Sequence, residues 1–163
     1  MAPKIKHINA ARVDILVYDF DGVLTDNKVL VFENGQEAVL CNRADGLAMS
    51  MIKKRGIPQV IISTERNDVV LVRARKLDIP AIHGVKDKKK ALADYCRANQ
   101  YDLKKVVYVG NDLNDLEAMQ SVGFPVAPAD AHKTILRLAK CVTKAKGGGG
   151  VVREMFELLV FGR

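Results

Sequence analysis

The sequence contains no tryptophan and only three cysteines, Cys41, Cys96 and Cys141. An odd count with no close pair argues against a disulfide framework and against a zinc site built on paired cysteines. No apolar run approaches the length of a membrane span, and the first twelve residues hold no apolar segment of signal-peptide length. We therefore expect a cytoplasmic protein that does not enter a membrane.

Aromatic residues make up only 6% of the chain, whereas its net charge is +7. A nucleic-acid-binding protein can carry such a charge. The basic residues are nevertheless spread over several predicted helices, and few aromatic side chains are present on which bases could stack. Solvated helix faces that also attract anionic substrates explain the charge better, so nucleic acid is not the expected partner.

Short apolar runs alternate with amphipathic stretches along the chain. Buried strands are predicted at 15–18, 60–62, 81–82, 106–109, 125–127 and 141–142. Helices are predicted at 45–55, 67–77, 87–99, 114–122, 130–139 and 151–160. This alternation is typical of an α/β protein with a doubly wound, Rossmann-like parallel sheet. The 163 residues suit one domain, 1–163.

Two segments interrupt the alternation. Apolar and polar residues alternate on either side of Asn34-Gly35, which predicts a β-hairpin over about 27–41. Four consecutive glycines, 147–150, predict a flexible joint within a C-terminal tail over about 146–163. The predicted elements use up the remaining residues, which leaves no stretch long enough for an inserted cap domain.

Polar residues follow the predicted strands at the points where they end. Asp19 and Asp21 follow the first strand, Ser63 follows the second, and the segment 110–115 follows the fourth, while Lys88 begins a helix after a loop. In a parallel sheet these groups converge on one edge. Asp19 and Asp21 point to the same side, and two carboxylates so close together favour a cation such as Mg²⁺ between them and a phosphate.

This set of side chains suits phosphoryl transfer, which depends mainly on positioning and charge neutralisation. One carboxylate can act as a nucleophile through an aspartyl-phosphate, and a second can protonate the leaving oxygen and later activate water. A serine hydroxyl and a lysine ammonium can hold the phosphoryl oxygens. The residues therefore predict a Mg²⁺-dependent phosphatase.

The order of these motifs resembles that of the haloacid dehalogenase superfamily of phosphatases. The motifs are Asp19-x-Asp21-Gly22-Val23-x-Thr25-Asp26, Ser63, Lys88 and Gly110-Asn111-Asp112-x-Asn114-Asp115. The hairpin and the segments 43–46, 84–88 and 147–154 further resemble the capless sugar-acid phosphatases. That group comprises 3-deoxy-manno-octulosonate 8-phosphate phosphatases, relatives acting on nine-carbon sialic-type acids, and the C-terminal domain of some acylneuraminate cytidylyltransferases. The resemblance runs from about 13 to 160.

The resemblance implies roles for the first three motifs. Asp19 looks like the nucleophile and a metal ligand. Asp21 looks like the general acid and base, which would also bind the metal through its backbone carbonyl. Ser63 and Lys88 look like the pair that holds the phosphate. The implied cofactor is Mg²⁺, and the implied partners are a small phosphorylated sugar acid and further copies of the chain, in a homotetramer whose hairpins close neighbouring sites.

The fourth motif contains one departure from the family pattern. Asn111 and Asp112 fall at the metal-binding loop, and Asp115 resembles the carboxylate that supports this loop. The family usually has Asp where this chain has Asn111. An amide oxygen binds magnesium but brings no charge, which places the metal affinity in question.

The residues that would choose the substrate also differ from one branch of the family. The octulosonate enzymes usually continue the serine motif with Gly-Arg, whereas Thr64 and Glu65 stand here. Glu65 resembles the nine-carbon-acid relatives and favours a sialic-type 9-phosphate. Arg43, which either binds a substrate carboxylate or pairs with Asp45, and Arg153 in the tail are further substrate-binding candidates.

Two other functions remain open at this point. One is a catalytically weakened oligomerisation or binding module associated with a nucleotide-sugar-acid synthetase, which the uncharged Asn111 motivates. The other is a phospho-accepting receiver domain, but its phosphorylated Asp would end a later strand, where this chain has Ser63. The intact Asp19, Asp21 and Lys88 favour the phosphatase over both.

Overall fold

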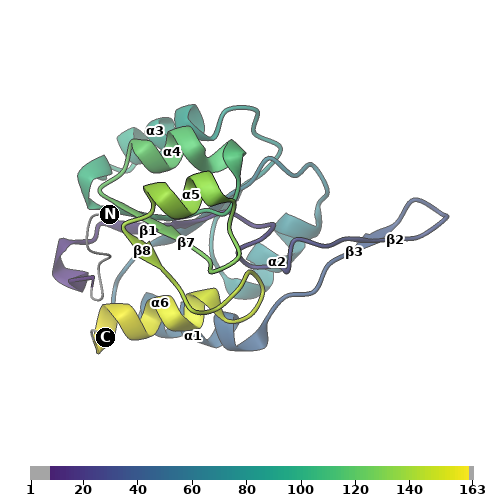
Figure 1. Ribbon diagram of the computed structural model, residues 1–163, viewed down its shortest axis with the longest axis horizontal. Helices are drawn as coiled ribbons and strands as arrows, with labels where there is room; N and C mark the ends of the chain where they lie inside the picture. Colours follow the sequence, from purple (N-terminus) through teal and green to yellow (C-terminus); the bar gives the residue numbers. More distant parts are fainter. Residues whose placement is uncertain (1–7, 162–163) are drawn as a thin grey trace.

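A parallel sheet of six strands, in the order β5-β4-β1-β6-β7-β8, runs through the middle of the molecule (Figure 1). The computed structural model describes residues 8–161, so residues 1–7 and 162–163 of the expected domain lie outside it. The strands are β1 (Ile15–Tyr18), β4 (Gln59–Ile62), β5 (Ala81–Ile82), β6 (Val106–Val109), β7 (Phe124–Ala127) and β8 (Cys141–Val142). The predicted doubly wound α/β fold is confirmed.

Helices cover both faces of this sheet (Figure 1). One face carries α1 (Arg43–Lys54), α2 (Val69–Leu77) and α6 (Val151–Val160), and the other carries α3 (Lys88–Ala98), α4 (Leu116–Gln120) and α5 (Lys133–Leu138). Three short 3₁₀ turns, η1 (Ala10–Arg12), η2 (Leu103–Lys105) and η3 (Leu113–Asp115), complete the elements. The helix expected at 114–122 is divided into η3 and α4, because Asp112 and Asp115 form a capping box at the start of η3.

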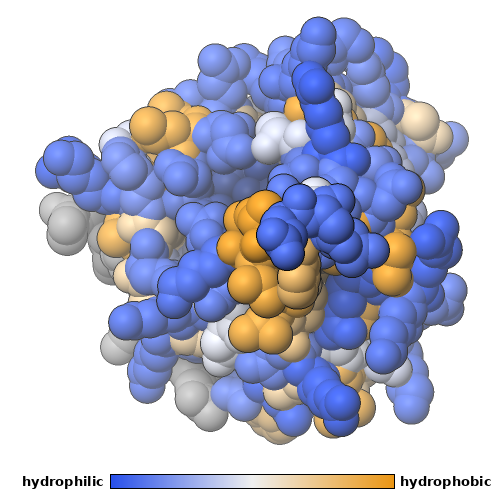
Figure 2. Space-filling model, turned by 90° about the vertical axis from the view of Figure 1, so that its right-hand side faces the viewer, coloured by the Kyte–Doolittle hydropathy of each residue, from blue (hydrophilic) through white to orange (hydrophobic). Residues whose placement is uncertain are grey.

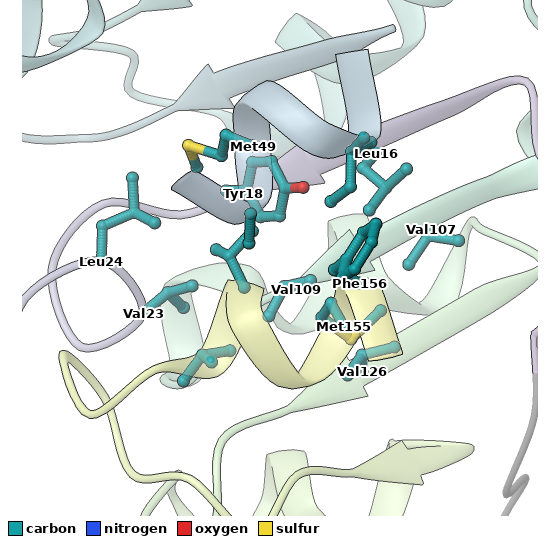
Figure 3. Packing of buried hydrophobic residues seen from close by; sticks show 14 of the residues in the cluster. Leu16, Tyr18, Val23, Leu24, Met49, Val107, Val109, Val126, Met155 and Phe156 are labelled. Atoms are coloured by element: carbon teal, nitrogen blue, oxygen red, sulfur yellow. The ribbon is translucent and has the colours of Figure 1, made fainter. Parts of the chain in front are cut away.

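Alternate residues of β1 face the two helical layers, as the pleat of a strand requires. Leu16 and Tyr18 belong to the cluster that packs against α1 and α6, whereas Ile15 and Val17 belong to the cluster under α3, α4 and α5. Figure 3 shows the first cluster, with Phe156 of α6 close to the sheet residues. Because both faces are covered, the strands are almost entirely apolar, with the buried Gln59 of β4 as an exception.

A two-stranded hairpin projects from one end of the molecule (Figure 1). Its strands, β2 (Leu30–Val31) and β3 (Glu37–Ala38), pair antiparallel, which confirms the predicted hairpin. Gly35 adopts a φ of +82° in the turn, a conformation that favours glycine. The apolar residues of the hairpin are exposed, with exposed fractions of 46–78% at Val29, Leu30, Val31, Phe32 and Leu40.

The four glycines at 147–150 do not form a flexible joint, so that expectation is wrong. The N–H of Gly148 donates a hydrogen bond to the carbonyl of Val23 at 3.0 Å. A Cβ at Gly147 would lie 2.3 Å from the carbonyl oxygen of Gly22. Glycine is needed here because the segment packs directly against the backbone of the loop that follows β1.

Within residues 8–161, no helix combines the length and the apolar character required to cross a membrane.

Candidate active site

The site lies in the crevice beyond the carboxyl ends of β1, β4 and β6. The chain moves outward from β1 to β4 and β5, then returns to the other side of β1 at β6, so the strand order reverses at this point. A cavity of about 260 Å³ lies here. The residues that line it are Asp19, Asp21, Asn27, Ser63, Thr64, Asn111, Asp112 and Asn114. Sequence motifs up to 95 positions apart, from Asp19 to Asn114, are thus brought together.

Lys88 joins two buried carboxylates behind this cavity. Its Nζ lies 2.8 Å from Oδ1 of Asp19 and 2.7 Å from Oδ1 of Asp115. The exposed fraction of each of the three side chains is 5% or less. Lys88 is the first residue of α3, and Asp87 caps that helix by accepting a hydrogen bond from the N–H of Lys90. The helix start therefore aims the ammonium group at the nucleophile candidate.

Asp115 holds the loop between β6 and α4 in place. Its Oδ1 accepts a second hydrogen bond from the hydroxyl of Tyr108, at 2.9 Å. Its Oδ2 accepts hydrogen bonds from the backbone N–H groups of Asn111 and Asp112, at 2.9 and 3.3 Å. Because every partner of this carboxylate belongs to the site or its loop, Asp115 occupies the supporting position that the sequence predicts.

The electrostatics of the buried group depend on the balance between burial and pairing. Burial raises the pKa of Asp19 to about 8, the charge of Asp115 adds to that rise, and Lys88 opposes it. Burial lowers the pKa of Lys88, but Asp19 and Asp115 more than offset this and leave it above its ordinary value. Lys88 therefore keeps its positive charge at neutral pH. An additional cation beside Asp19 would favour its ionised form.

Asp21 lies at the mouth of the cavity and is only half-buried. Its Oδ1 accepts a hydrogen bond from the hydroxyl of Thr25 at 3.1 Å. Burial raises the pKa of Asp21, with the hydrogen bond from Thr25 acting in the opposite direction. A carboxyl group with a raised pKa, and with one oxygen that has no hydrogen-bond partner among residues 8–161, suits proton transfer.

Ser63 stands at the end of β4 with an exposed fraction of 1%. Its backbone N–H donates to the carbonyl of Ile82, and its Oγ accepts a hydrogen bond from the N–H of Glu65 at 3.1 Å. The same hydroxyl can donate a hydrogen bond to a ligand oxygen in the cavity that Ser63 lines. Thr64 accepts a hydrogen bond from Nδ2 of Asn114, so the β4 and β6 loops meet across the cavity.

The donor atoms for a metal ion come from the loops after β1 and β6. In one orientation the amide nitrogen of Asn111 lies 3.2 Å from Oδ2 of Asp19 and 2.9 Å from the backbone oxygen of Asp21. Turning the amide over puts its oxygen there instead, so that three oxygen atoms face one another. Oxygen donors converging in this way fit a hard divalent cation such as Mg²⁺.

This donor set differs from a cluster of acidic side chains. Residues 8–161 contain no group of three or more His, Cys, Asp and Glu side chains arranged to bind a metal. The fit depends instead on one carboxylate, one backbone carbonyl and one amide. Gly22 makes the arrangement possible, because its φ is +79° and a Cβ there would lie 1.9 Å from Nδ2 of Asn111.

Two further candidates, Asp112 and Glu65, accept hydrogen bonds from backbone groups of their own loops. Asp112 lines the cavity, but its Oδ1 accepts a hydrogen bond from the N–H of Leu113 and begins η3. Oε1 of Glu65 caps its own turn by accepting from the N–H of Asn67 at 2.7 Å. Glu65 lines a second hollow beside the cavity. A role for these two residues in metal or substrate binding stays a prediction.

The two arginine candidates, Arg43 and Arg153, line neither the cavity nor the second hollow beside it. Arg43 is exposed at the start of α1, and Asp45, its suggested partner, is buried and accepts a hydrogen bond from the N–H of Arg153 instead. The guanidinium of Arg153 lies 4.0 Å from Sδ of Met51. For either arginine to bind a substrate, part of that substrate would have to lie outside the cavity.

Sequence reasoning missed three residues of the site. Asn27 lines the cavity, Thr25 supports Asp21, and Tyr108 supports Asp115. Thr25 lies within the first motif and Asn27 directly follows it, which was a usable signal. Tyr108 lies within an apolar strand, where only the tertiary structure reveals that its hydroxyl reaches a buried carboxylate.

Comparison with known proteins points to one family. Residues 76–155 match the family model of the haloacid dehalogenase-like hydrolases. Over 152 residues, the chain is 35% identical to the 3-deoxy-D-manno-octulosonate 8-phosphate phosphatase of Yersinia pestis. This match covers 93% of the chain and 81% of that phosphatase.

Solved structures give the same result. A HAD family hydrolase from Streptomyces avermitilis superimposes with a TM-score of 0.92 at 42% identity, over 94% of this chain and 88% of that one. The 3-deoxy-D-manno-octulosonate 8-phosphate phosphatase from Moraxella catarrhalis superimposes with a TM-score of 0.90 at 30% identity, over 94% and 89%. The latter was solved in complex with a magnesium ion, a phosphate ion and a KDO molecule.

Proposed function

Because this chain belongs to the haloacid dehalogenase-like hydrolases and is a phosphomonoester hydrolase of the sugar-acid type, we propose that it uses Mg²⁺ and an aspartyl-phosphate at Asp19. The contact of buried Lys88 with Asp19, at the edge of a cavity that Ser63 also lines, is the observation that carries the proposal. The relatives favour 3-deoxy-D-manno-octulosonate 8-phosphate as the substrate. Glu65 makes a nine-carbon sialic-type 9-phosphate the second substrate to test.

The first half of the reaction transfers the phosphoryl group to the protein. A carboxylate oxygen of Asp19 attacks phosphorus, and the bond between phosphorus and the sugar oxygen breaks. Asp21 donates its proton to that oxygen, so the sugar acid leaves with a hydroxyl group. The raised pKa of Asp21 favours the protonated form that this step requires, and Thr25 keeps Oδ1 oriented.

The second half restores the enzyme. A water molecule attacks phosphorus, and the Asp21 carboxylate takes one of its protons. The bond between phosphorus and the Asp19 oxygen breaks, which regenerates the carboxylate and yields inorganic phosphate. Both proton transfers involve Asp21, which lines the cavity and is only half-buried, so that water can reach it.

Charge neutralisation is divided among several groups. Lys88 and the hydroxyl of Ser63 would hold phosphoryl oxygens, and Asp115 keeps Lys88 in place. Asp19, the backbone carbonyl of Asp21 and Asn111 would hold Mg²⁺, which neutralises phosphate charge and favours ionised Asp19. A phosphate that displaces water from this buried group would meet preoriented partners, which is the main source of catalysis in phosphoryl transfer.

The test is phosphate release from 3-deoxy-D-manno-octulosonate 8-phosphate and from nine-carbon 9-phosphates in the presence of Mg²⁺. We expect release that stops with a chelator and falls at least ~10³-fold in Asp19→Asn. Asp94→Asn, an exposed carboxylate of α3 that pairs with Lys90, is the matched control and should retain full activity. Equal release by Asp19→Asn and the original protein would refute the mechanism. No release from any of these substrates would favour the weakened binding module instead.

We further propose that copies of the chain associate through the hairpin. Figure 2 views the molecule from the end at which the hairpin projects and shows an apolar band within hydrophilic surroundings. Leu30 and Val31 are 60% and 61% exposed, and Leu40 is 78% exposed, which is unusual for neighbouring large apolar residues. A two-stranded ribbon is marginal by itself and is stabilised by packing. A tetramer is the expected state, and a cytoplasmic location stays a prediction.

Light scattering at micromolar concentration tests the association. We expect a mass of about four chains for the original protein and a smaller mass for Leu30→Asn/Leu40→Asn, because polar groups there oppose burial. Leu113→Asn removes a leucine of η3 that is 53% exposed and should leave the mass unchanged. A fully active monomer would overturn the proposal.

A further inference from the structure

A second hollow adjoins the reaction cavity and shares two residues with it. Its volume is about 240 Å³, and its lining comes from the hairpin, the loop after β4 and the start of α2. Among the residues lining the two hollows, Asp21 and Asn27 are common to both. Asp21 is the proposed proton donor to the leaving oxygen. The atoms of the substrate that follow this oxygen therefore pass beside Asn27.

The chemistry of the second hollow restricts what part of a substrate enters it. Besides Asn27, the hollow is lined by three acidic residues, Asp21, Glu37 and Glu65, by one basic residue, Lys28, and by valines. Carboxylates accept hydrogen bonds from hydroxyl groups and repel another carboxylate. A hydroxyl-bearing carbon chain fits this hollow, and the acid group of a sugar acid has to lie beyond it.

The walls of this hollow are held in place before a substrate arrives. Oε2 of Glu37 accepts a hydrogen bond from Nδ2 of Asn67 at 3.0 Å, which links the hairpin to the loop before α2. Oε1 of Glu65 accepts from the N–H of Asn67 at 2.7 Å. Asn67 therefore joins both carboxylates, and a ligand would meet them already oriented.

Asn27 has an unusual backbone conformation. Its φ is +63°, in the left-handed region that asparagine tolerates better than most other residues. Its N–H donates a hydrogen bond to Oγ1 of Thr25 at 3.2 Å, and the same hydroxyl donates to Asp21. Within residues 8–161, the Asn27 side-chain amide has no hydrogen-bond partner, and the residue is exposed. Its donor and acceptor are both available to a ligand.

We propose that the amide of Asn27 binds the hydroxyl group on the carbon next to the phosphate ester and so selects hydroxyl-bearing substrates. This inference rests on the proposed phosphatase function and adds a specificity-determining residue to it. The 8-phosphate of an octulosonate carries such a hydroxyl on carbon 7. This hydrogen bond would orient the leaving group beside Asp21. Its loss should therefore lower the preference for hydroxyl-bearing substrates more than the rate of the chemical step.

A matched pair of substrates isolates this hydroxyl. Glycerol 3-phosphate carries a hydroxyl next to its ester carbon, and 3-hydroxypropyl phosphate is the same molecule without it. We expect Asn27→Gly to lower the ratio of kcat/KM between the two about 3- to 10-fold, the range of one hydrogen bond. Glycine adopts a positive φ readily, so the backbone of the loop should persist. Asn27→Asp keeps the size of the side chain but loses the donor, and should lower the ratio as well.

Gln100→Gly is the control, because Gln100 is also exposed, has a φ of +60° and lies outside both hollows. It should leave the ratio unchanged. An unchanged ratio in both Asn27 variants would overturn the proposal, as would an equal loss on both substrates. Activity on the glycerol pair without activity on any sugar-acid phosphate would refute the proposed substrate and not the role of Asn27.

Discussion

The Nζ atom of Lys88 lies 2.8 Å from Oδ1 of Asp19, and the two side chains are 1% and 5% exposed. Such a pair has lost nearly all of its hydration, so each partner depends on the other and on Asp115 for compensation. The first strand and the third helix are thereby joined at the reacting centre. This pair and the neighbouring metal-binding loop lead to four predictions.

Replacing Lys88 with methionine should both inactivate and destabilise the protein. It leaves the carboxylates of Asp19 and Asp115 buried without a cation, which costs about 3–5 kcal/mol in the free energy of unfolding. Urea denaturation measures this loss. Lys89→Met is the matched control, because Lys89 is 55% exposed and lies 3.8 Å from Glu117, and it should change stability by less than about 0.5 kcal/mol. Equal stabilities for the two variants would contradict the prediction.

Asp19→Asn should stabilise the protein in the absence of divalent metal, although it removes the nucleophile. The pKa of Asp19 is about 8 in the folded protein, above its ordinary value of 3.8. The folded state therefore holds a proton that the unfolded chain releases, and stability falls as the pH rises from about 4 to 8. Asparagine removes this loss.

Thermal unfolding at pH 5 and pH 8 with a chelator present measures the effect. The variant should gain on the order of 1–2 kcal/mol at pH 8 and less at pH 5. Added Mg²⁺ should reverse the order at pH 8, because the ion favours the ionised carboxylate of the original protein. A variant less stable than the original at pH 8 in chelator would show that Lys88 dominates the charge balance.

Asn111→Asp should strengthen the binding of Mg²⁺. The amide of Asn111 lies within 3.2 Å of Oδ2 of Asp19 and 2.9 Å of the backbone oxygen of Asp21, so a carboxylate there adds charge beside the ion. We expect the Mg²⁺ concentration for half-maximal phosphate release to fall on the order of tenfold. Asp112→Asn should have a smaller effect, because Oδ1 of Asp112 already accepts a hydrogen bond from Leu113. A larger effect at Asp112 would make it the principal ligand.

Gly22→Ala should disrupt the metal-binding loop through contact as well as through backbone strain. Its Cβ would lie 1.9 Å from Nδ2 of Asn111. Gly35→Ala is a control with nearly the same φ, +82° against +79°, but with no atom within 4 Å of the added Cβ. Both variants should lose about 1–2 kcal/mol of stability, because alanine is strained in the left-handed conformation. Only Gly22→Ala should also lose phosphate release, by about 100-fold.

The sequence was most informative where one physical signal dominated. The short apolar runs at β1, β4 and β6 suit strands of a sheet buried on both faces, and each strand was located within one residue. The helix predicted at 114–122 was the least accurate. Asp112 and Asp115 cap a 3₁₀ turn there, and a capping box is a contact that periodicity does not register.

The glycines at 147–150 illustrate the opposite situation. Their composition is that of a flexible linker, yet Gly147 and Gly148 pack against the loop after β1. A missing side chain permits either freedom or close approach, and only the neighbouring backbone distinguishes the two. The partner of Asp45 was likewise not predictable from the sequence. Arg43 was the suggested partner, but Asp45 accepts a hydrogen bond from the N–H of Arg153.

The chemical groups of the site, and the edge of the sheet at which they meet, were predictable from the sequence. Motif order and strand periodicity are local properties, and the parallel sheet converts them into convergence at one edge. The tertiary structure alone decided how those groups are charged and what surrounds them. The pairing of Lys88 with Asp19, the hydroxyl of Tyr108 on Asp115 and the position of Asn27 between two hollows depend on distances between distant segments. Electrostatic energies follow those distances and the burial of the atoms, which no linear pattern encodes.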